Sequence, residues 1–299
     1  MKPESIALEL VGIAVEAAQH SGAAVGRVDD ASEGAAALLG KRVLVAPHDA
    51  CGQCEVCRRG GATVCPLATR RGAPLGPRLR VSSRWVVVLG DGLDLPGPAA
   101  AAVAGDVTTA YTLYARTGLS SREPVVVIGT NAITRFLVQI LRAKGITPTV
   151  IVDPVGRSEF APLHPGPGGD DWRDWLLAKG AAAVNGRDAA LHAAVTAAIS
   201  TQGQGARPWR LIVTDATALP RAASLAGPRA TLTVLAGDST PSVPGDLLAR
   251  EVTVIGVAGP HPDLIVEAAA MCVKGEIDLV GSVVVGNVRD TTRATVIVV

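Results

Sequence analysis

The chain has few aromatic residues, almost no net charge and no long apolar run. Aromatic residues make up 3% of its 299 residues, so its cores must be built from Ala, Val, Leu and Ile. A formal net charge of +1 gives no overall attraction to nucleic acid or to an anionic membrane. No stretch approaches the roughly 18 uninterrupted apolar residues that indicate a membrane-spanning helix. A hydrophobic content of 48% instead indicates a globular protein of one large or two ordinary domains.

The chain also lacks a recognisable secretory signal and a spread of cysteines. Glu4, Glu9 and Glu16 interrupt what would have to be the apolar region of a signal peptide. Only five cysteines occur in the sequence, and one of them, Cys272, lies far from the others. Such usage does not suggest the disulfide framework of an oxidising compartment. We therefore expect reduced thiols and a cytoplasmic protein.

The remaining four cysteines form the most specific motif of the chain. Cys51, Cys54, Cys57 and Cys65 follow the spacing C-x2-C-x2-C-x7-C. Four thiolates within one short loop can close a tetrahedral shell around Zn2+, and a closed shell leaves no position for a substrate. The spacing therefore predicts a structural zinc ion rather than a catalytic one. Two disulfides or four unrelated thiols are the alternative to a metal site.

The pattern of strands and helices changes near residue 106. Before it, short β patterns such as 41–45 and 84–89 are separated by turns. After it, apolar β-branched segments alternate with helical patterns, which is typical of a doubly wound parallel sheet. The expected strands of this part are 124–128, 149–152, 183–184, 210–214, 231–235 and 252–257. The expected helices are 107–117, 133–144 and 188–200, with one more through Trp172 and Trp175, and the last strand, 293–299, is expected to return to the first domain.

The cysteine motif, the segment Val107-Thr108-Thr109-Ala110-Tyr111 and the strand, turn and helix after residue 124 occur in a familiar order. Together they resemble the zinc-containing medium-chain dehydrogenase/reductase superfamily, which includes the alcohol dehydrogenases. The resemblance covers roughly residues 22 to 299 and implies an α/β fold, in which a GroES-like β domain is joined to a doubly wound Rossmann domain. It implies a GroES-like domain over 1–105 with the zinc lobe at 51–65, a Rossmann domain over 106–280 and a returning strand over 281–299. It also implies that the four clustered cysteines are structural-zinc ligands.

The catalytic zinc of this family lacks its usual ligands in this chain. The Gly-His-Glu motif falls on Ser21-Gly22-Ala23, the third ligand position falls on Gly105, and no cysteine precedes Cys51. His20 lies two residues out of register, and Asp106 would need a shift of one residue and new partners. A catalytic zinc needs about three protein ligands and an open position. We therefore expect that the catalytic zinc has been lost.

The turn after residues 124–128 is the expected dinucleotide site. A dinucleotide fold places three glycines here, but only the first, Gly129, is kept, while Asn131 and Thr134 replace the second and third. Asn131 tolerates the left-handed conformation, so the turn can still form, although its side chain would project toward the phosphates. The start of the following helix still offers backbone N–H groups to an anion. The resemblance implies that Gly129, Asn131 and Ile133 contact NAD(H).

Two further residues complete the expected cofactor site. Thr109 matches the family's residue beneath the nicotinamide. Asp153 follows the second strand of the Rossmann pattern, where an acid meets the adenosine ribose and favours NAD over NADP. Alternatively, Asp153 caps the turn that follows it, and the altered glycine loop belongs to a fold that has lost its cofactor.

These features lead to two hypotheses for function. The first is a zinc-binding, alcohol dehydrogenase-like oxidoreductase that transfers hydride between NAD(P) and a carbonyl, an alcohol or an activated alkene without a catalytic zinc. Thr108, Thr109 and Tyr111 are its nearest candidate donors to a developing oxyanion. The second is a catalytically silent dehydrogenase-like subunit that acts as a structural or regulatory partner of an active enzyme. A blocked dinucleotide loop would favour the second hypothesis.

Partners follow from the same resemblance. We expect a homo-oligomer such as a dimer, or a hetero-oligomer with a related dehydrogenase subunit, and residues 278–285 are the candidate edge for pairing of Rossmann sheets. Several arginines occur between residues 58 and 84, against one acid at Glu55 in the same stretch of the lobe. They are interpreted as a solvated face or subunit contact, because the interleaved aromatics of a single-strand binder are missing. Neither nucleic acid nor a membrane is an expected partner.

Overall fold

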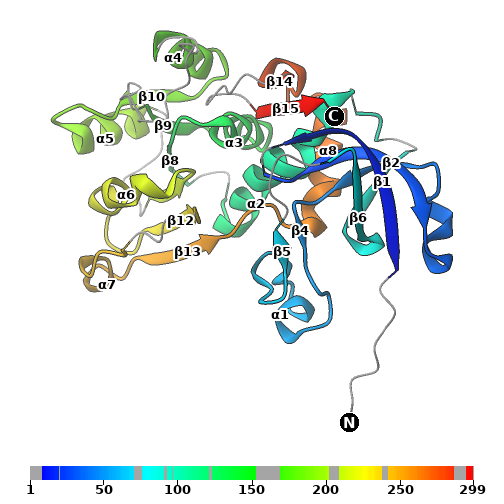
Figure 1. Cartoon of the computed structure of the whole chain (residues 1–299). Helices are drawn as coiled ribbons and strands as arrows, with labels where there is room; N and C mark the ends of the chain where they lie inside the picture. Colours follow the sequence, from blue (N-terminus) through cyan, green and yellow to red (C-terminus); the bar gives the residue numbers. More distant parts are fainter. Residues whose placement is uncertain are drawn as a thin grey trace.

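The computed structural model of the chain is built around two β-sheets (Figure 1). It describes residues 9–19, 21–70, 76–90, 93–95, 97–120, 123–152, 169–201, 209–237, 242–285 and 294–298. One sheet has seven strands and is mostly antiparallel, and the other has six strands and is parallel throughout. A separate two-stranded ribbon carries the cysteine lobe. The predicted α/β fold class is therefore confirmed.

The seven-stranded sheet has the order β14-β15-β1-β2-β3-β7, and β6 also pairs with β1. Its strands are β1 (Leu10–Gln19), β2 (Ala24–Ala31), β3 (Arg42–Val45), β6 (Arg78–Ser82), β7 (Val86–Leu89), β14 (Val283–Val285) and β15 (Ala294–Val298). Along β1, Val11, Ile13 and Val15 are buried in alternation because successive side chains of a strand point to opposite faces. They form a small aliphatic core with Val43 and Val81.

The parallel sheet has the order β10-β9-β8-β11-β12-β13. Its strands are β8 (Val125–Ile128), β9 (Pro148–Val152), β10 (Ala182–Asn185), β11 (Arg210–Val213), β12 (Thr231–Leu235) and β13 (Thr253–Val257). All residues of β8 and β9 are buried, as expected for strands covered by helices on both faces. The strand order reverses between β8 and β11, and ligands of such sheets bind outside the carboxyl ends of the strands at this point.

Helices cover both faces of the parallel sheet and fill the space between the two sheets (Figure 1). The helices of the described residues are α1 (Glu55–Arg58), which lies in the cysteine lobe, α2 (Thr108–Thr117), α3 (Ala132–Ala143), α4 (Gly169–Ala178), α5 (Leu191–Thr201), α6 (Leu219–Leu225), α7 (Asp246–Ala249) and α8 (Ile265–Val273). No helix of the described residues is long and apolar enough to cross a membrane.

A run of alanines joins the two sheets into one core. Residues 100–104 are completely buried and share a hydrophobic cluster with Leu44 of the first sheet and Val127 of the second. Their short side chains let the elements on either side approach closely. A π-helical turn, η5 (Val103–Val107), follows and leads directly into α2. Such turns occur often at functional sites because they displace a side chain from the regular helical position.

The predicted strands and helices are present within a few residues of their expected limits. β15 pairs with β1, so the last described strand belongs to the seven-stranded sheet. The prediction that 278–285 supplies an edge of the parallel sheet is wrong, because β14 in that segment pairs with β15 instead. Backbone hydrogen bonds to the returning strand draw this segment into the other sheet. The edge of the parallel sheet on that side is β13.

Candidate metal centre and cofactor site

The cysteine lobe brings four sulfur atoms together. The Sγ atoms of Cys51, Cys54, Cys57 and Cys65 all lie within 4.8 Å of one another. Three of their separations are 3.9, 3.8 and 3.6 Å. A zinc–sulfur bond of about 2.3 Å in tetrahedral geometry requires sulfur atoms about 3.8 Å apart. The four free thiols therefore have the spacing of a zinc shell, and the cluster fits a structural zinc ion.

Backbone N–H groups donate hydrogen bonds to two of these sulfur atoms. The backbone N–H groups of Cys54 and Cys57 point at the Sγ atoms of Cys51 and Cys54, each at 3.4 Å. Hydrogen bonds from the backbone N–H groups of Gln53 and Cys54 lower the pKa of Cys51 to about 6. Burial, with the neighbouring thiols, raises the pKa of Cys57 to about 12. A divalent cation would stabilise all four thiolates at once, because ligand deprotonation and metal binding are coupled.

The lobe is attached to the rest of the molecule at several points. It begins and ends on the ribbon of β4 (His48–Asp49) and β5 (Thr69–Arg70). The buried Trp85 donates from Nε1 to Ala50 O at 2.8 Å, and Arg84 donates to Gly52 O at 2.9 Å. The ring of His261, in the loop after β13, contacts Gly60 O on the other side. The lobe therefore connects the first sheet to the loop that follows the parallel sheet.

Members of the arginine run make contacts within the chain. Arg59 pairs with Glu55 at 2.6 Å, and Arg78 pairs with Asp29 at 2.9 Å. Arg84 also donates to Gly52 O, so three arginines of the run have partners within the chain.

At Gly105, the position of the family's third catalytic-zinc ligand, the Gln19 side chain occupies the space that a side chain would enter. A Cβ atom on Gly105 would lie 2.0 Å from Gln19 Oε1 and 3.0 Å from Ser21 Oγ. Gln19 is only 3% exposed and fills this space from the end of β1. Its Nε2 donates to Asp106 Oδ2 at 2.8 Å, and its Oε1 accepts from Asp106 N at 3.2 Å. Sequence reasoning missed Gln19, because no motif marks it and its partner lies 87 positions away.

Burial of Asp106 changes its protonation. Desolvation raises the pKa of this carboxyl to about 6, although the hydrogen bond from Gln19 acts in the opposite direction. Asp106 lies in the π-helical turn η5, which leads into the helix that carries Thr108 and Thr109. It is therefore an oriented acid with a pKa close to neutral, a combination common at functional sites.

Two of the three predicted hydroxyl donors, Thr108 and Thr109, already donate within the chain. Thr108 Oγ1 donates to Val103 O at 2.5 Å, and Thr109 Oγ1 donates to Gly105 O at 2.9 Å. Both side chains are buried and bonded within their own helix. Burial raises the pKa of Tyr111, with a further contribution from Glu267. Among the described residues, only the four cysteines bring three or more metal-binding side chains close together, and His20 lies outside that part of the chain.

The turn after β8 keeps one property of a dinucleotide loop. Gly129 has a φ of +137°, and a Cβ atom there would lie 2.1 Å from Thr214 Oγ1, so only glycine fits. Asn131 has φ −100° and ψ 178°, so it is extended, and the turn forms without the left-handed conformation that asparagine tolerates. Its side chain instead accepts a hydrogen bond from the backbone N–H of Thr134 at 3.0 Å and caps α3.

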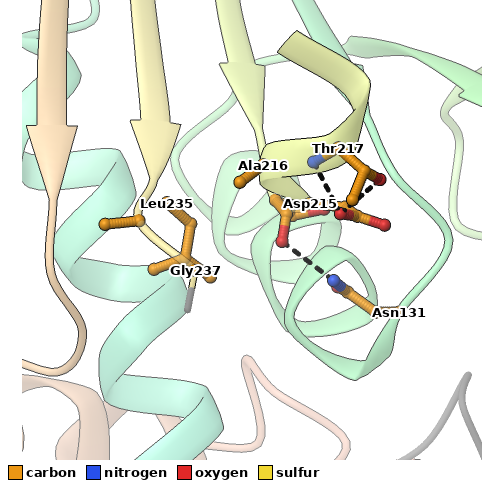
Figure 2. Close-up of a pocket in the computed structure, with 8 residues that line it drawn as sticks. Asn131, Asp215, Ala216, Thr217, Leu235 and Gly237 are labelled. Atoms are coloured by element: carbon orange, nitrogen blue, oxygen red, sulfur yellow. Dashed lines mark hydrogen bonds between the residues drawn. The ribbon is translucent and has the colours of Figure 1, made fainter. Parts of the chain in front are cut away.

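A cavity of about 430 Å³ opens beside this cap. It lies at the carboxyl ends of β8, β11 and β12, at the reversal of strand order, and Figure 2 shows Asn131 and Asp215 on its wall. The described residues that line it are Asn131, Thr214, Asp215, Ala216, Thr217, Leu235, Ala236 and Gly237. None of them is basic, and Asp215 accepts hydrogen bonds from Thr217 N and Oγ1 at 3.0 and 2.7 Å.

The structure brings together only some of the predicted cofactor residues. Gly129 and Asn131 form the turn at the start of α3, and Ile133, in the first turn of this helix, packs against the main core. Thr109 is 5% exposed and does not line the described cavity. Asp153 lies outside the described residues.

Solved structures with the same fold are alcohol and sugar dehydrogenases. The alcohol dehydrogenase TADH from Thermus sp. ATN1 is 17% identical over 97% of this chain and 92% of its own, with a TM-score of 0.76. A short chain alcohol dehydrogenase from E. coli CFT073, solved with the cofactor NADH, is 17% identical over the same shares, with a TM-score of 0.75. The D-arabinose dehydrogenase from Sulfolobus solfataricus is 19% identical over 97% and 93%, with a TM-score of 0.73.

Comparison of the sequence with protein-family models and with curated proteins finds no match. At these identities the likeness to solved structures concerns the fold. The chain therefore has the fold of these dehydrogenases, which agrees with the resemblance found in the sequence.

Proposed function

We propose that the chain is an alcohol dehydrogenase-like oxidoreductase that transfers hydride between a nicotinamide dinucleotide and a carbonyl, an alcohol or an activated alkene. The observation that carries this proposal is the cavity at the carboxyl ends of β8, β11 and β12, where dinucleotides bind in doubly wound sheets. The E. coli dehydrogenase of the same fold was solved with NADH, which supports the choice of cofactor.

We propose that Cys51, Cys54, Cys57 and Cys65 hold one structural zinc ion, whereas no zinc ion acts in catalysis. The sulfur spacing supports the first part. The second part is supported by Gly105, which has no side chain to bind a metal, and by Gln19, which occupies the space in front of it. Without a metal, another group must stabilise the charge that develops on the substrate oxygen.

Asp106 is our candidate for that group, because it is an acid oriented by Gln19, although it is not among the residues that line the described cavity. A protonated carboxyl can donate a hydrogen bond and then its proton to a carbonyl oxygen while the reduced nicotinamide, when bound, supplies hydride to the carbon. The product is an alcohol, the dinucleotide is oxidised, and the carboxylate regains its proton from water. The hydrogen bonds to Gln19 fix the orientation of the carboxyl, and its raised pKa keeps it partly protonated near neutral pH.

A titration of the purified chain with NADH tests the dinucleotide part of this proposal. We expect saturable binding in calorimetry, followed by NADH oxidation with some member of a panel of ketones, enones and quinones. Binding should be specific for the dinucleotide, so AMP and nicotinamide added separately serve as controls. Heat signals no larger than those controls at millimolar NADH or NADPH would contradict a dinucleotide-dependent activity.

The capped helix α3 favours a second candidate function. Asn131 already occupies the backbone N–H that a phosphate would use, and none of the described residues lining the cavity is basic. A chain that has lost its dinucleotide would act as a catalytically silent subunit of an oligomer. Its partner would be a second copy or a related active dehydrogenase.

For either function we propose pairing of the molecule through β13. This strand ends the parallel sheet, and its residues Thr253, Val254 and Gly256 are exposed. Exposed edge strands associate readily, and a charge placed on one blocks association. We therefore expect Val254→Lys to convert a dimer to a monomer in sedimentation velocity, whereas Leu248→Lys on α7, at a more exposed site, leaves the dimer intact. Equal sedimentation of both variants as dimers would contradict pairing through β13.

A further inference from the structure

The start of helix α3 already has an acceptor supplied by the chain itself. In dinucleotide-binding folds, phosphate oxygens accept hydrogen bonds from the backbone N–H groups at this position. Here the backbone N–H of Thr134 donates to Asn131 Oδ1 at 3.0 Å, and the hydroxyl of Thr134 lies 3.2 Å from the same oxygen. We propose that the Asn131 carboxamide occupies the position of a phosphate oxygen and thereby sets the affinity of the cavity for dinucleotides.

The carboxamide is held from both ends. Its Nδ2 donates to Thr214 O at 2.9 Å, at the carboxyl end of β11 (Figure 2). Beneath it, the hydroxyls of Thr134 and Thr214 lie 2.7 Å apart, and both residues are almost fully buried. The absence of a side chain at Gly129 makes this contact possible, because a Cβ atom there would overlap Thr214. The network therefore joins α3 to β11 across the site where pyrophosphate would lie.

The charges around the cavity affect phosphate binding in two opposing ways. The carboxamide oxygen bears only a partial charge, so it meets the helix N-terminus less favourably than a phosphate would. However, a phosphate would have to displace it and would lie near the carboxylate of Asp215 without help from a basic residue among the described lining. Displacement of the carboxamide and repulsion by Asp215 both weaken dinucleotide binding. An uncharged ligand that carries hydroxyl groups would not be repelled by Asp215.

This inference rests on the proposed function only in the choice of NADH as the ligand for the test. The chain is titrated with NADH by calorimetry as the wild type and as Asn131→Gly. Glycine at a helix cap costs the helix little stability, and it frees the N–H of Thr134. We expect the variant to bind NADH at least about tenfold more tightly, through one additional charge-assisted hydrogen bond.

Two further variants make the test specific. Asn185→Gly is the matched control, because Asn185 Oδ1 also accepts a local backbone hydrogen bond, from Arg187 N at 3.0 Å, but at the end of β10 and outside the cavity. Asn131→Asp keeps the cap and places a full negative charge at the phosphate position. It should weaken NADH binding at least about tenfold. Because a carboxylate cannot donate to Thr214 O as Asn131 Nδ2 does, some loss of melting temperature is expected, and the fold is checked by circular dichroism.

The outcomes separate the inference from the proposed function. Tighter binding by Asn131→Gly alone supports the inference, even if the wild type binds no NADH, in which case the silent subunit becomes the better function. Equal or weaker binding by Asn131→Gly overturns it, even if the wild type turns out to be an active reductase. If Asn131→Gly does not fold, Asn131→Asp decides: unchanged NADH affinity overturns the inference, and a loss of affinity with an intact fold supports it.

Discussion

Replacing Asp106 by Asn should make the folded chain more stable at pH 8 and inactive at the same time. The folded-state pKa of Asp106 is raised from 3.8 to about 6, so the folded chain binds this proton more tightly than the unfolded chain. Stability contributed by the protonated form is therefore present below about pH 4 and is lost as the pH rises through about 6. A shift of this size corresponds to at most about 3 kcal/mol of unfolding free energy.

Asparagine has no proton to lose in this pH range, so the variant does not lose stability as the pH rises. Its side-chain oxygen can still accept the hydrogen bond from Gln19 Nε2, as Asp106 does. We therefore expect urea unfolding of Asp106→Asn to give a smaller dependence of unfolding free energy on pH between 4 and 8 than the wild type. Asp30→Asn, at an exposed position of β2, serves as the control and should keep the wild-type pH dependence. A variant that is less stable than the wild type throughout this range would show that the carboxylate has a structural role instead.

The same substitution should reduce carbonyl reduction by about 10²- to 10⁴-fold, which is the usual contribution of a positioned general acid. In the wild type, kcat for reduction should fall as the pH rises through about 6, because the carboxyl then loses the proton that it donates. The rate of NADH oxidation as a function of pH measures both effects. Wild-type turnover by Asp106→Asn would exclude this residue as the proton donor. Gain of stability with loss of turnover is the pattern of a group retained for function rather than for folding.

Replacing Cys51 and Cys54 together by Ser should remove zinc and destabilise the lobe. Closed zinc sites contribute directly to folding stability, because the four ligands are not held in a preformed site in the unfolded chain. We expect zinc content to fall from one ion per chain to none, and the melting temperature to drop by on the order of 10 °C. Zinc is measured by atomic emission and unfolding by calorimetry. Loss of the lobe should also release the contact between His261 and Gly60, and so loosen the loop after β13.

Cys272→Ala is the matched control for this prediction. Cys272 lies on α8, away from the cluster, and burial raises the pKa of its thiol to about 12, so it is a poor metal ligand. Its replacement should leave the zinc content unchanged. If the double serine variant kept both its zinc and its melting temperature, the four cysteines could not be a structural metal site.

The parts of the candidate site that were predicted from the sequence are local in the chain. The four cysteines lie within one short loop, so their spacing alone limits the geometry that they can adopt. Gly129 is similar, because a strand followed by a glycine turn and a helix is recognisable within a few residues. The capping role of Asn131 was not predicted. Its side chain accepts from the nearby Thr134 N but also donates to Thr214 O, which is distant in the sequence.

The parts that were missed depend on residues far apart in the sequence. Gln19 and Asp106 are separated by 87 positions, and although Asp106 was noted beside the third ligand position, no pattern marks Gln19 as its partner. Thr134 and Thr214 are 80 positions apart and meet only because β8 and β11 are neighbours. The prediction that β14 lies at the edge of the parallel sheet failed for a related reason. An apolar strand can join any sheet with a free edge, and its sequence does not specify which one.

The sequence by itself determined the elements, the order in which they alternate and the presence of a four-thiol metal lobe, since apolar periodicity, turn residues and ligand spacing act over short stretches of chain. Only the tertiary structure decided which side chains meet in front of Gly105 and at the start of α3. Burial raises the pKa of Asp106, and contact across the sheet fixes Asn131. Both effects require desolvation and partners that folding alone brings together.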